Sequence, residues 1–357
     1  MRRHPAWLLL VVMTAAPAAA RAEATTPANL PARPVVVETT LPTHRDHVPQ
    51  CAFDGKVETY FRSGRACKAG DTLTLIVEKP VRAGRVEVLT GTPDGKDALN
   101  AAVLETSADG TSFAPAATFK GGVAKADLGN RPVKALRVRA TGDAAAFVVR
   151  EIAMESLPAI PTFRYPVEVV LDDSQVPEMK DWCRRAKETA EAWYPVLAEA
   201  LRIEGYAPPR RINLTFKKGM DGIAGTSGGN IFCADGWFKA HPDDVGAIIH
   251  EVIHVVQSYP KYDPPWLVEG IADYVRFWVF EPNTRRRPLN PARIRYQDSY
   301  QVTGAFLAWA VKTYDKDLVL KLNEACHKGK YEVGLFKQYA GKDLDALWEE
   351  FRASLKE

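Results

Sequence analysis

Two stretches decide the fold of the C-terminal half of the chain: His250-Glu251-Val252-Ile253-His254 and Trp266-Leu267-Val268-Glu269-Gly270-Ile271-Ala272-Asp273-Tyr274-Val275. The first stretch predicts a helix, because it lies within an apolar stripe and follows two possible N-terminal caps, Asp243 and Asp244. Positions i and i+4 share one helix face, so His250 and His254 can bind one metal ion at about 2.0–2.1 Å. Glu251 follows the first histidine, which places its carboxylate beside a metal's water rather than on the metal. The alternative is a pair of ordinary surface or packed histidines.

The second stretch predicts another helix, which begins at Asp263-Pro264-Pro265 with Asp263 as its cap. Glu269 and Asp273 are also i and i+4, and acids among Trp, Leu, Val and Ile are costly to bury without a cation. We therefore expect Glu269 as the third zinc ligand and Asp273 as a residue that orients a ligand histidine. The alternative is an exposed acidic face. Gln257 and Pro260 stand where a metzincin has Gly and a third His, which excludes that class.

These motifs, with Gly228-Gly229-Asn230-Ile231, Tyr300-Gln301-Val302-Thr303 and Phe306-Leu307, resemble the basic secretory protein family of plants and bacteria over roughly residues 160–355. The resemblance implies a gluzincin-like zinc metallopeptidase. Its metal ligands would be His250, His254 and Glu269, and Glu251 would be the general base. In related gluzincins a tyrosine donates to the tetrahedral oxyanion, and Tyr300 is the candidate for that role; the alternative is a buried structural tyrosine.

The function this implies is that of a secreted zinc-dependent peptidase, which hydrolyses peptide bonds with a zinc-activated water and Glu251 as base. We see no aminopeptidase-type acidic substrate motif upstream, which favours endopeptidase action on a protein or peptide substrate. The glycine-rich segment 225–231 is either a strand edge for substrate or a plain loop. Residues 281–299, rich in Arg and Pro, form either a lid or a solvated surface loop.

Residues 36–156 predict an all-β domain. Thr72–Val77, Arg85–Leu89 and Ala135–Arg139 alternate apolar and polar residues, and Asp94-Gly95 and Asp109-Gly110 are turn signals between such runs. A small β-sandwich is the simplest architecture for this pattern.

Three segments of this half resemble the discoidin, or coagulation-factor type C, family: Ala52-Phe53-Asp54-Gly55 with Thr59, residues 105–113, and Val149-Arg150-Glu151-Ile152. The resemblance implies a galactose-binding-type jelly-roll sandwich that binds glycans or cell surfaces. It also implies a Ca²⁺ ion near the Asp-Gly loop, with Asp54 at the matching position. The alternative is a packing or spacer module.

We therefore expect a signal peptide at 1–22, the discoidin-like sandwich at 36–156, a linker at 157–163 and the metallopeptidase domain at 164–357. The peptidase domain is expected to be α+β, with strands at 167–171 and 211–216, a helix at 178–201 and a mostly helical part after 243. A competing interpretation of the whole chain is a glycan- or cell-wall-binding protein with an inactive peptidase-like domain.

The first residues predict export. A basic start, the apolar run 7–13 and Ala20-Arg21-Ala22 are typical of a cleaved signal peptide, and the run is too short for a stable membrane anchor. Without the three arginines of this leader, the 47 basic residues fall to 44 and equal the 44 acidic ones, so no nucleic-acid partner is expected. Five cysteines in an exported protein allow two disulfides, and Cys51–Cys67 is the expected pair.

Overall fold

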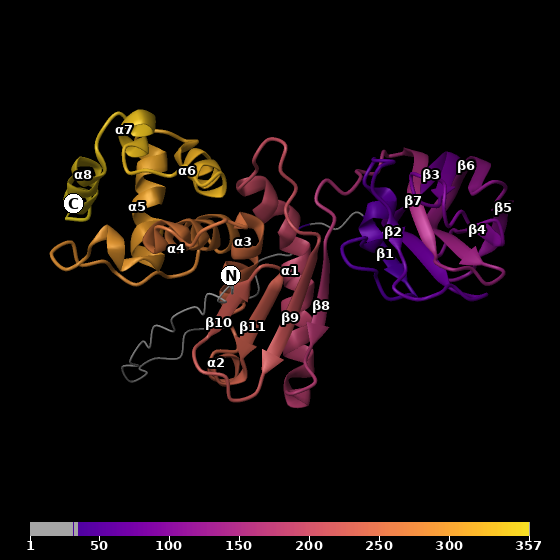
Figure 1. Cartoon of the computed structure of the whole chain (residues 1–357), viewed down its shortest axis with the longest axis horizontal. Coiled ribbons are helices and arrows are strands. Elements are labelled where there is room, and N and C mark those ends of the chain that lie inside the picture. Colours follow the sequence, from indigo (N-terminus) through magenta and orange to yellow (C-terminus); the bar gives the residue numbers. More distant parts are fainter. Residues whose placement is uncertain (1–30, 32–34, 357) are drawn as a thin grey trace, which may run out of the picture. The chain divides into compact units, whose positions relative to one another are not determined.

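The computed structural model describes residue 31 and residues 35–356, and the chain forms two compact units. The first unit comprises Pro31–Val169 with Ala207–Ile212, and the second comprises Val170–Tyr206 and the chain from Asn213 onward (Figure 1). The expected leader at 1–22 lies outside the described residues, and the expected boundaries at 157–163 stay predictions.

The first unit is an antiparallel β-sandwich, which confirms the expected fold class. Its strands are β1 (Val35–Thr39), β2 (Phe61–Arg62), β3 (Thr72–Thr90), β4 (Ala102–Ser107), β5 (Ala114–Thr118), β6 (Val123–Ala140) and β7 (Val148–Leu157), with a short 3₁₀ helix η1 (Pro49–Phe53). Along the sheet the order is β2-β7-β3-β6-β4-β5, and β1 also pairs with β3.

Two long strands, β3 and β6, build both layers of this sandwich. The first part of β3 pairs with β1, its last part pairs with β7, and β6 accompanies it throughout. Register shifts between Ile76 and Val81 and between Ala83 and Arg85 mark where the pair bends. The two predicted segments at 72–77 and 85–89 are therefore parts of one strand. Their inward side chains, such as Leu73, Leu75 and Val88, are fully buried in the core.

The expected Cys51–Cys67 disulfide is wrong. Both thiols are free and buried, as are the other three cysteines. Cys51 lies in η1, whereas Cys67 makes a β-bridge with Ala144, so closeness in sequence does not bring the two thiols together.

The second unit begins with a four-stranded sheet in the order β10-β11-β9-β8. The strands are β8 (Glu168–Asp172), β9 (Arg211–Lys217), β10 (Ala224–Ser227) and β11 (Asn230–Ala234), and the 3₁₀ turn η2 (Pro177–Met179) precedes α1 (Lys180–Ala200). β11 runs parallel to β9 and antiparallel to β10, and β10 is one of the two edge strands of the sheet. The glycine-rich segment is thus a hairpin that turns at Gly228-Gly229.

Helices make up the rest of this unit: α2 (Asp235–Ala240), α3 (Gly246–Gln257), α4 (Pro265–Val275), the π-helical turn η3 (Arg276–Phe280), the 3₁₀ turn η4 (Tyr296–Asp298), α5 (Tyr300–Thr313), α6 (Leu318–His327), α7 (Leu335–Ala340) and α8 (Leu344–Ser354). This order confirms the expected α+β domain with a helical C-terminal half. In Figure 1 the helices from α5 to α8 gather away from the sheet, and α3 and α4 lie between them and the strands. None of the helices that the structure describes is long and apolar enough to cross a membrane.

Helix α3 is the centre of this unit. It contacts α1, α4, β10 and β11, and eleven of its twelve residues are buried. An apolar helix that is covered on nearly every side holds its polar residues in fixed positions.

The helix starts differ in part from expectation. Pro264 is the N-cap residue of α4 and makes no side-chain cap, so the expected cap at Asp263 is wrong. Near the start of α3, the backbone N–H of Ala247 donates to the Asp244 carboxylate at 3.1 Å, which agrees with the expected use of an aspartate there.

Candidate metal centre

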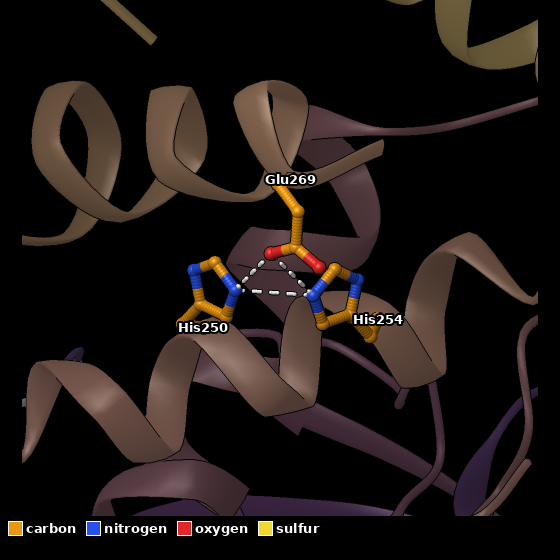
Figure 2. A group of neighbouring side chains, drawn as sticks. All are labelled: His250, His254 and Glu269. Atoms are coloured by element: carbon orange, nitrogen blue, oxygen red, sulfur yellow. Dashed lines mark hydrogen bonds and ion pairs between the residues drawn. The ribbon is translucent and has the colours of Figure 1, made fainter. Parts of the chain in front are cut away.

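The structure brings His250, His254 and Glu269 together between α3 and α4 (Figure 2). The Nε2 atoms of the two histidines are 3.1 Å apart, and Glu269 Oε2 lies 2.9 Å from His250 Nε2 and 3.4 Å from His254 Nε2. In a tetrahedral zinc site with bonds of about 2.0–2.1 Å, ligand atoms are about 3.3–3.4 Å apart. Three inward-facing ligand atoms at nearly this spacing fit one zinc ion with a fourth position left for water or substrate.

Charge in this cluster is concentrated and poorly solvated. His250 and Glu269 are 7% and 6% exposed. Burial lowers the pKa of His250, but its hydrogen bonds to Asp273 and Glu269 outweigh this and raise it well above its usual value. Burial also raises the pKa of Glu269, and the two histidines overcome this and lower it. A buried carboxylate that needs nearby positive charge to remain ionised is a good environment for a divalent cation.

Each side chain of the cluster is held by one further residue. His250 Nδ1 donates to Asp273 Oδ1 at 2.7 Å, so the structure places Asp273 where the sequence expects it. His254 Nδ1 donates to Gln257 Oε1 at 2.7 Å, and the Tyr262 hydroxyl donates to Glu269 Oε1. The second carboxylate oxygen of Glu269 therefore faces the histidines. Such partners fix ring and carboxylate orientation before a metal binds.

Glu251 lies beside the cluster and is 8% exposed. Its Oε2 accepts a hydrogen bond of 2.7 Å from the hydroxyl of Thr226 on the edge strand β10. The carboxylate is thus tied to the sheet and not to a ligand, as expected for a group that acts on water rather than on the metal.

Tyr300 also lies at the site. Its ring is stacked 6.0 Å, centre to centre, from that of His250, and the residue is 38% exposed. Burial, and then the charges of Glu269 and Glu251, raise the pKa of Tyr300 to about 12. Tyr300 follows Ser299, and both have positive φ (49° and 62°), so an uncommon backbone conformation presents the phenol at the start of α5. The hydroxyl remains a proton donor at neutral pH.

Three residues at the centre, Gln257, Thr226 and Tyr262, are not predicted from the sequence. For Gln257 a usable signal exists, because a glutamine three residues after a candidate ligand histidine lies on the same side of the helix. Tyr262 and Thr226 carry no such signal, because they reach Glu269 and Glu251 only through the fold.

The first unit holds a second group of acids. Asp54 and Glu151 are 6% and 7% exposed, and Glu151 Oε2 has no hydrogen-bond partner among the residues described. Burial and the charge of Asp54 raise the pKa of Glu151 to about 8. The Thr59 hydroxyl donates to Asp54 Oδ2 at 2.7 Å.

Comparison with known sequences gives one family match. Residues 183–351 match the family described as BSP, peptidase of plants and bacteria. No curated protein sequence matches the chain.

Comparison with solved structures gives similarity to family 32 carbohydrate-binding modules, and these resemble the N-terminal sandwich. CBM32-1 from a family 31 glycoside hydrolase of Clostridium perfringens is 15% identical, with 35% of this chain and 96% of that chain covered and a TM-score of 0.30. The family 32 module of Clostridium perfringens NanJ, solved with galactose, is 13% identical, with coverages of 36% and 98% and a TM-score of 0.30. Chitosan-binding module 2 of a Paenibacillus sp. IK-5 chitosanase/glucanase, solved with chitotriose, is 17% identical, with coverages of 34% and 95% and a TM-score of 0.30.

Proposed function

We propose, from the match of residues 183–351 to the family of peptidases of plants and bacteria, that the second unit is a zinc-dependent endopeptidase. The observation that carries the proposal is the arrangement of His250, His254 and Glu269 at nearly tetrahedral ligand spacing. A zinc ion at this position supplies Lewis acidity, which polarises a peptide carbonyl and acidifies water.

The chain's own residues supply the remaining parts of the reaction. Glu251, held by Thr226, accepts the proton of the attacking water and passes it to the leaving amine. Tyr300 donates a hydrogen bond to the developing oxyanion. Two observations support this role: its ring lies at the edge of the site, and its phenol stays protonated at neutral pH. Asp273 holds the ring of His250 so that Nε2 faces the metal position.

The test combines metal content with turnover. The purified chain is expected to contain about one zinc ion and to cleave casein or gelatin in a chelator-sensitive way. Glu251→Gln is expected to keep the zinc and to lower turnover by at least about 10²-fold. Glu349→Gln, at a side chain that is 67% exposed, is the control and is expected to leave both unchanged.

Two results would refute the proposal: wild-type activity in Glu251→Gln, or a chain with neither zinc nor chelator-sensitive cleavage. The second result would favour a binding protein with an inactive peptidase-like domain. Mapping the cleaved peptides distinguishes internal cleavage from removal of single N-terminal residues.

We also propose a Ca²⁺ site at Asp54 and Glu151 in the first unit. Two buried carboxylates, one with a free oxygen, are costly to ionise next to each other, and a hard cation with oxygen ligands removes that cost. Calcium is expected to raise the melting temperature of the wild-type chain and to have no such effect on Asp54→Asn. Binding of glycans or a cell surface by this unit is a further proposal, which a glycan array tests.

Export is the third proposal, and it rests on the sequence of residues 1–22. N-terminal sequencing of the protein recovered from periplasm or medium tests it. A mature chain that begins at Glu23 agrees with export, and an uncleaved chain in the cytoplasm contradicts it.

A further inference from the structure

Gln257, the last residue of α3, is a buried amide with an unusual position. It is 2% exposed and lies three residues after His254. Its Oε1 is 2.7 Å from His254 Nδ1, and its Nε2 donates to the carbonyl oxygen of Val268 at 3.1 Å. Val268 directly precedes Glu269 on α4. One side chain therefore contacts one metal-ligand residue and the backbone next to another.

The hydrogen bonds fix which way the amide points. The Val268 carbonyl can only accept, so the amide nitrogen faces it. The amide oxygen is then the atom that faces His254.

This arrangement selects the tautomer of His254. Because Oε1 of Gln257 can only accept, His254 Nδ1 must carry the proton and Nε2 must be the unprotonated nitrogen. Nε2 is the atom that lies 3.1 Å from His250 Nε2, at the metal position. The Gln257 side chain thus fixes both the orientation of the His254 ring and its tautomer before a metal ion binds.

We propose that Gln257 is a positioning residue that sets both His254 and the adjoining helix α4 for metal binding. The proposal rests on the metal site of the proposed function, and it does not depend on peptide hydrolysis. Through its hydrogen bond to Val268, the Gln257 amide connects the end of α3 to the first turns of α4. This one hydrogen bond therefore helps to fix the distance between the two histidines and Glu269.

Metal affinity tests this directly. Gln257→Met removes both hydrogen bonds at nearly constant volume, and it is expected to weaken zinc binding about 10–100-fold in competition with a chelator. It is also expected to change the visible absorption spectrum of the cobalt(II)-substituted protein, which reports ligand geometry.

Asn323→Leu is the matched control. Asn323 is another buried amide of the same unit, 1% exposed, which donates to the Leu201 carbonyl at 2.9 Å and accepts from Tyr259. Its loss leaves the bonds from Gln257 to His254 and Val268 in place. We expect a lower melting temperature with wild-type zinc affinity and cobalt spectrum.

The proposal is overturned if Gln257→Met binds zinc as tightly as wild type with the same cobalt spectrum, or if Asn323→Leu loses as much affinity. If Gln257→Met does not fold, a ¹⁵N-histidine NMR spectrum of the zinc-loaded wild type tests the proposal instead. That spectrum is expected to show His254 protonated at Nδ1 and metallated at Nε2, and the reverse assignment contradicts the proposal. Absence of zinc binding in the wild type would instead refute the proposed function itself.

Discussion

At the scale of single residues, the centre depends on hydrogen bonds that hold reactive groups in one orientation. Thr226 is the clearest case after Gln257, because its hydroxyl donates to Glu251 Oε2 and leaves Oε1 for water. A hydrogen bond to a charged group contributes about 1.5–3 kcal/mol, and about 1.4 kcal/mol corresponds to a tenfold change in rate.

Thr226→Val is therefore expected to lower kcat about tenfold or more with little change in KM, since the strand keeps its shape. Thr226→Ser retains the hydroxyl and is expected to recover most of the rate. Steady-state kinetics on casein-derived peptides measure both. Equal kcat values for wild type and Thr226→Val would show that Glu251 needs no such support.

Glu151 makes the stability of the first unit depend on pH. Its pKa is raised from 4.5 to about 8 in the folded chain, so folding favours the protonated carboxyl. Above 4.5 the unfolded chain has lost this proton while the folded chain still binds it, and stability falls as pH rises until about 8.

In calcium-free buffer, the free energy of unfolding of this unit is thus expected to be lower at pH 8 than at pH 5. Glu151→Gln should remove this difference in stability. Added calcium should also make the difference smaller, because the ion binds the ionised carboxylates. Urea denaturation at the two pH values measures it. If the free energy of unfolding depended on pH in the same way in Glu151→Gln, another group would be responsible for the effect.

At the scale of elements, the contact between α4 and α5 depends on the absence of a side chain at Gly270. A Cβ atom there would lie 2.2 Å from Thr303 Cγ2 and 2.5 Å from Thr303 Cβ. Thr303 is fully buried and cannot move away. Gly270 directly follows Glu269, the proposed metal ligand, so this close approach also determines where α4 presents the Glu269 carboxylate.

Gly270→Ala is expected to destabilise the second unit by about 1–3 kcal/mol and to weaken zinc binding. Gly236→Ala in α2 is the control, since a Cβ there meets nothing within 4 Å. Chemical denaturation and chelator competition give the two readouts. Wild-type stability in Gly270→Ala would mean that the helices separate at no cost.

The sequence was sufficient for the elements with strong periodicity and for the ligand-bearing motif. The helices that carry His250 and Glu269 were predicted because a metal-ligand spacing and an apolar stripe coincide on each. The contacts of Thr226 and Tyr262 were beyond reach, because the pairing of β10 with its neighbours and the path from α3 to α4 create them. The cysteine pairing failed for the same reason: short separation along the chain does not determine distance in space.

At the scale of the whole molecule, each unit has its own proposed ion, zinc in the second and calcium in the first. An ion that binds only the folded state stabilises it by about 4 kcal/mol at a free concentration a thousandfold above Kd. For units of this size, 1 kcal/mol shifts the melting temperature by about 2–4 °C.

Scanning calorimetry is expected to show this selectivity. Phenanthroline, which removes zinc, should lower the transition of the second unit by about 8–16 °C. Transfer by gel filtration into calcium-free buffer that contains zinc should lower the transition of the first unit. A single transition that responds equally to the two treatments would contradict independent sites.

The five buried thiols make it possible to follow each unit separately. Burial raises the pKa of Cys51, Cys183 and Cys326 to about 12 and that of Cys67 to about 11, and the pKa of Cys233 is also raised. Iodoacetamide reacts with thiolates, so native chains should resist alkylation until a unit opens. Mass spectrometry then measures alkylation separately for the two units, without any substitution. Peptides with residues 51 and 67 report unfolding of the first unit, and peptides with residues 183, 233 and 326 report unfolding of the second.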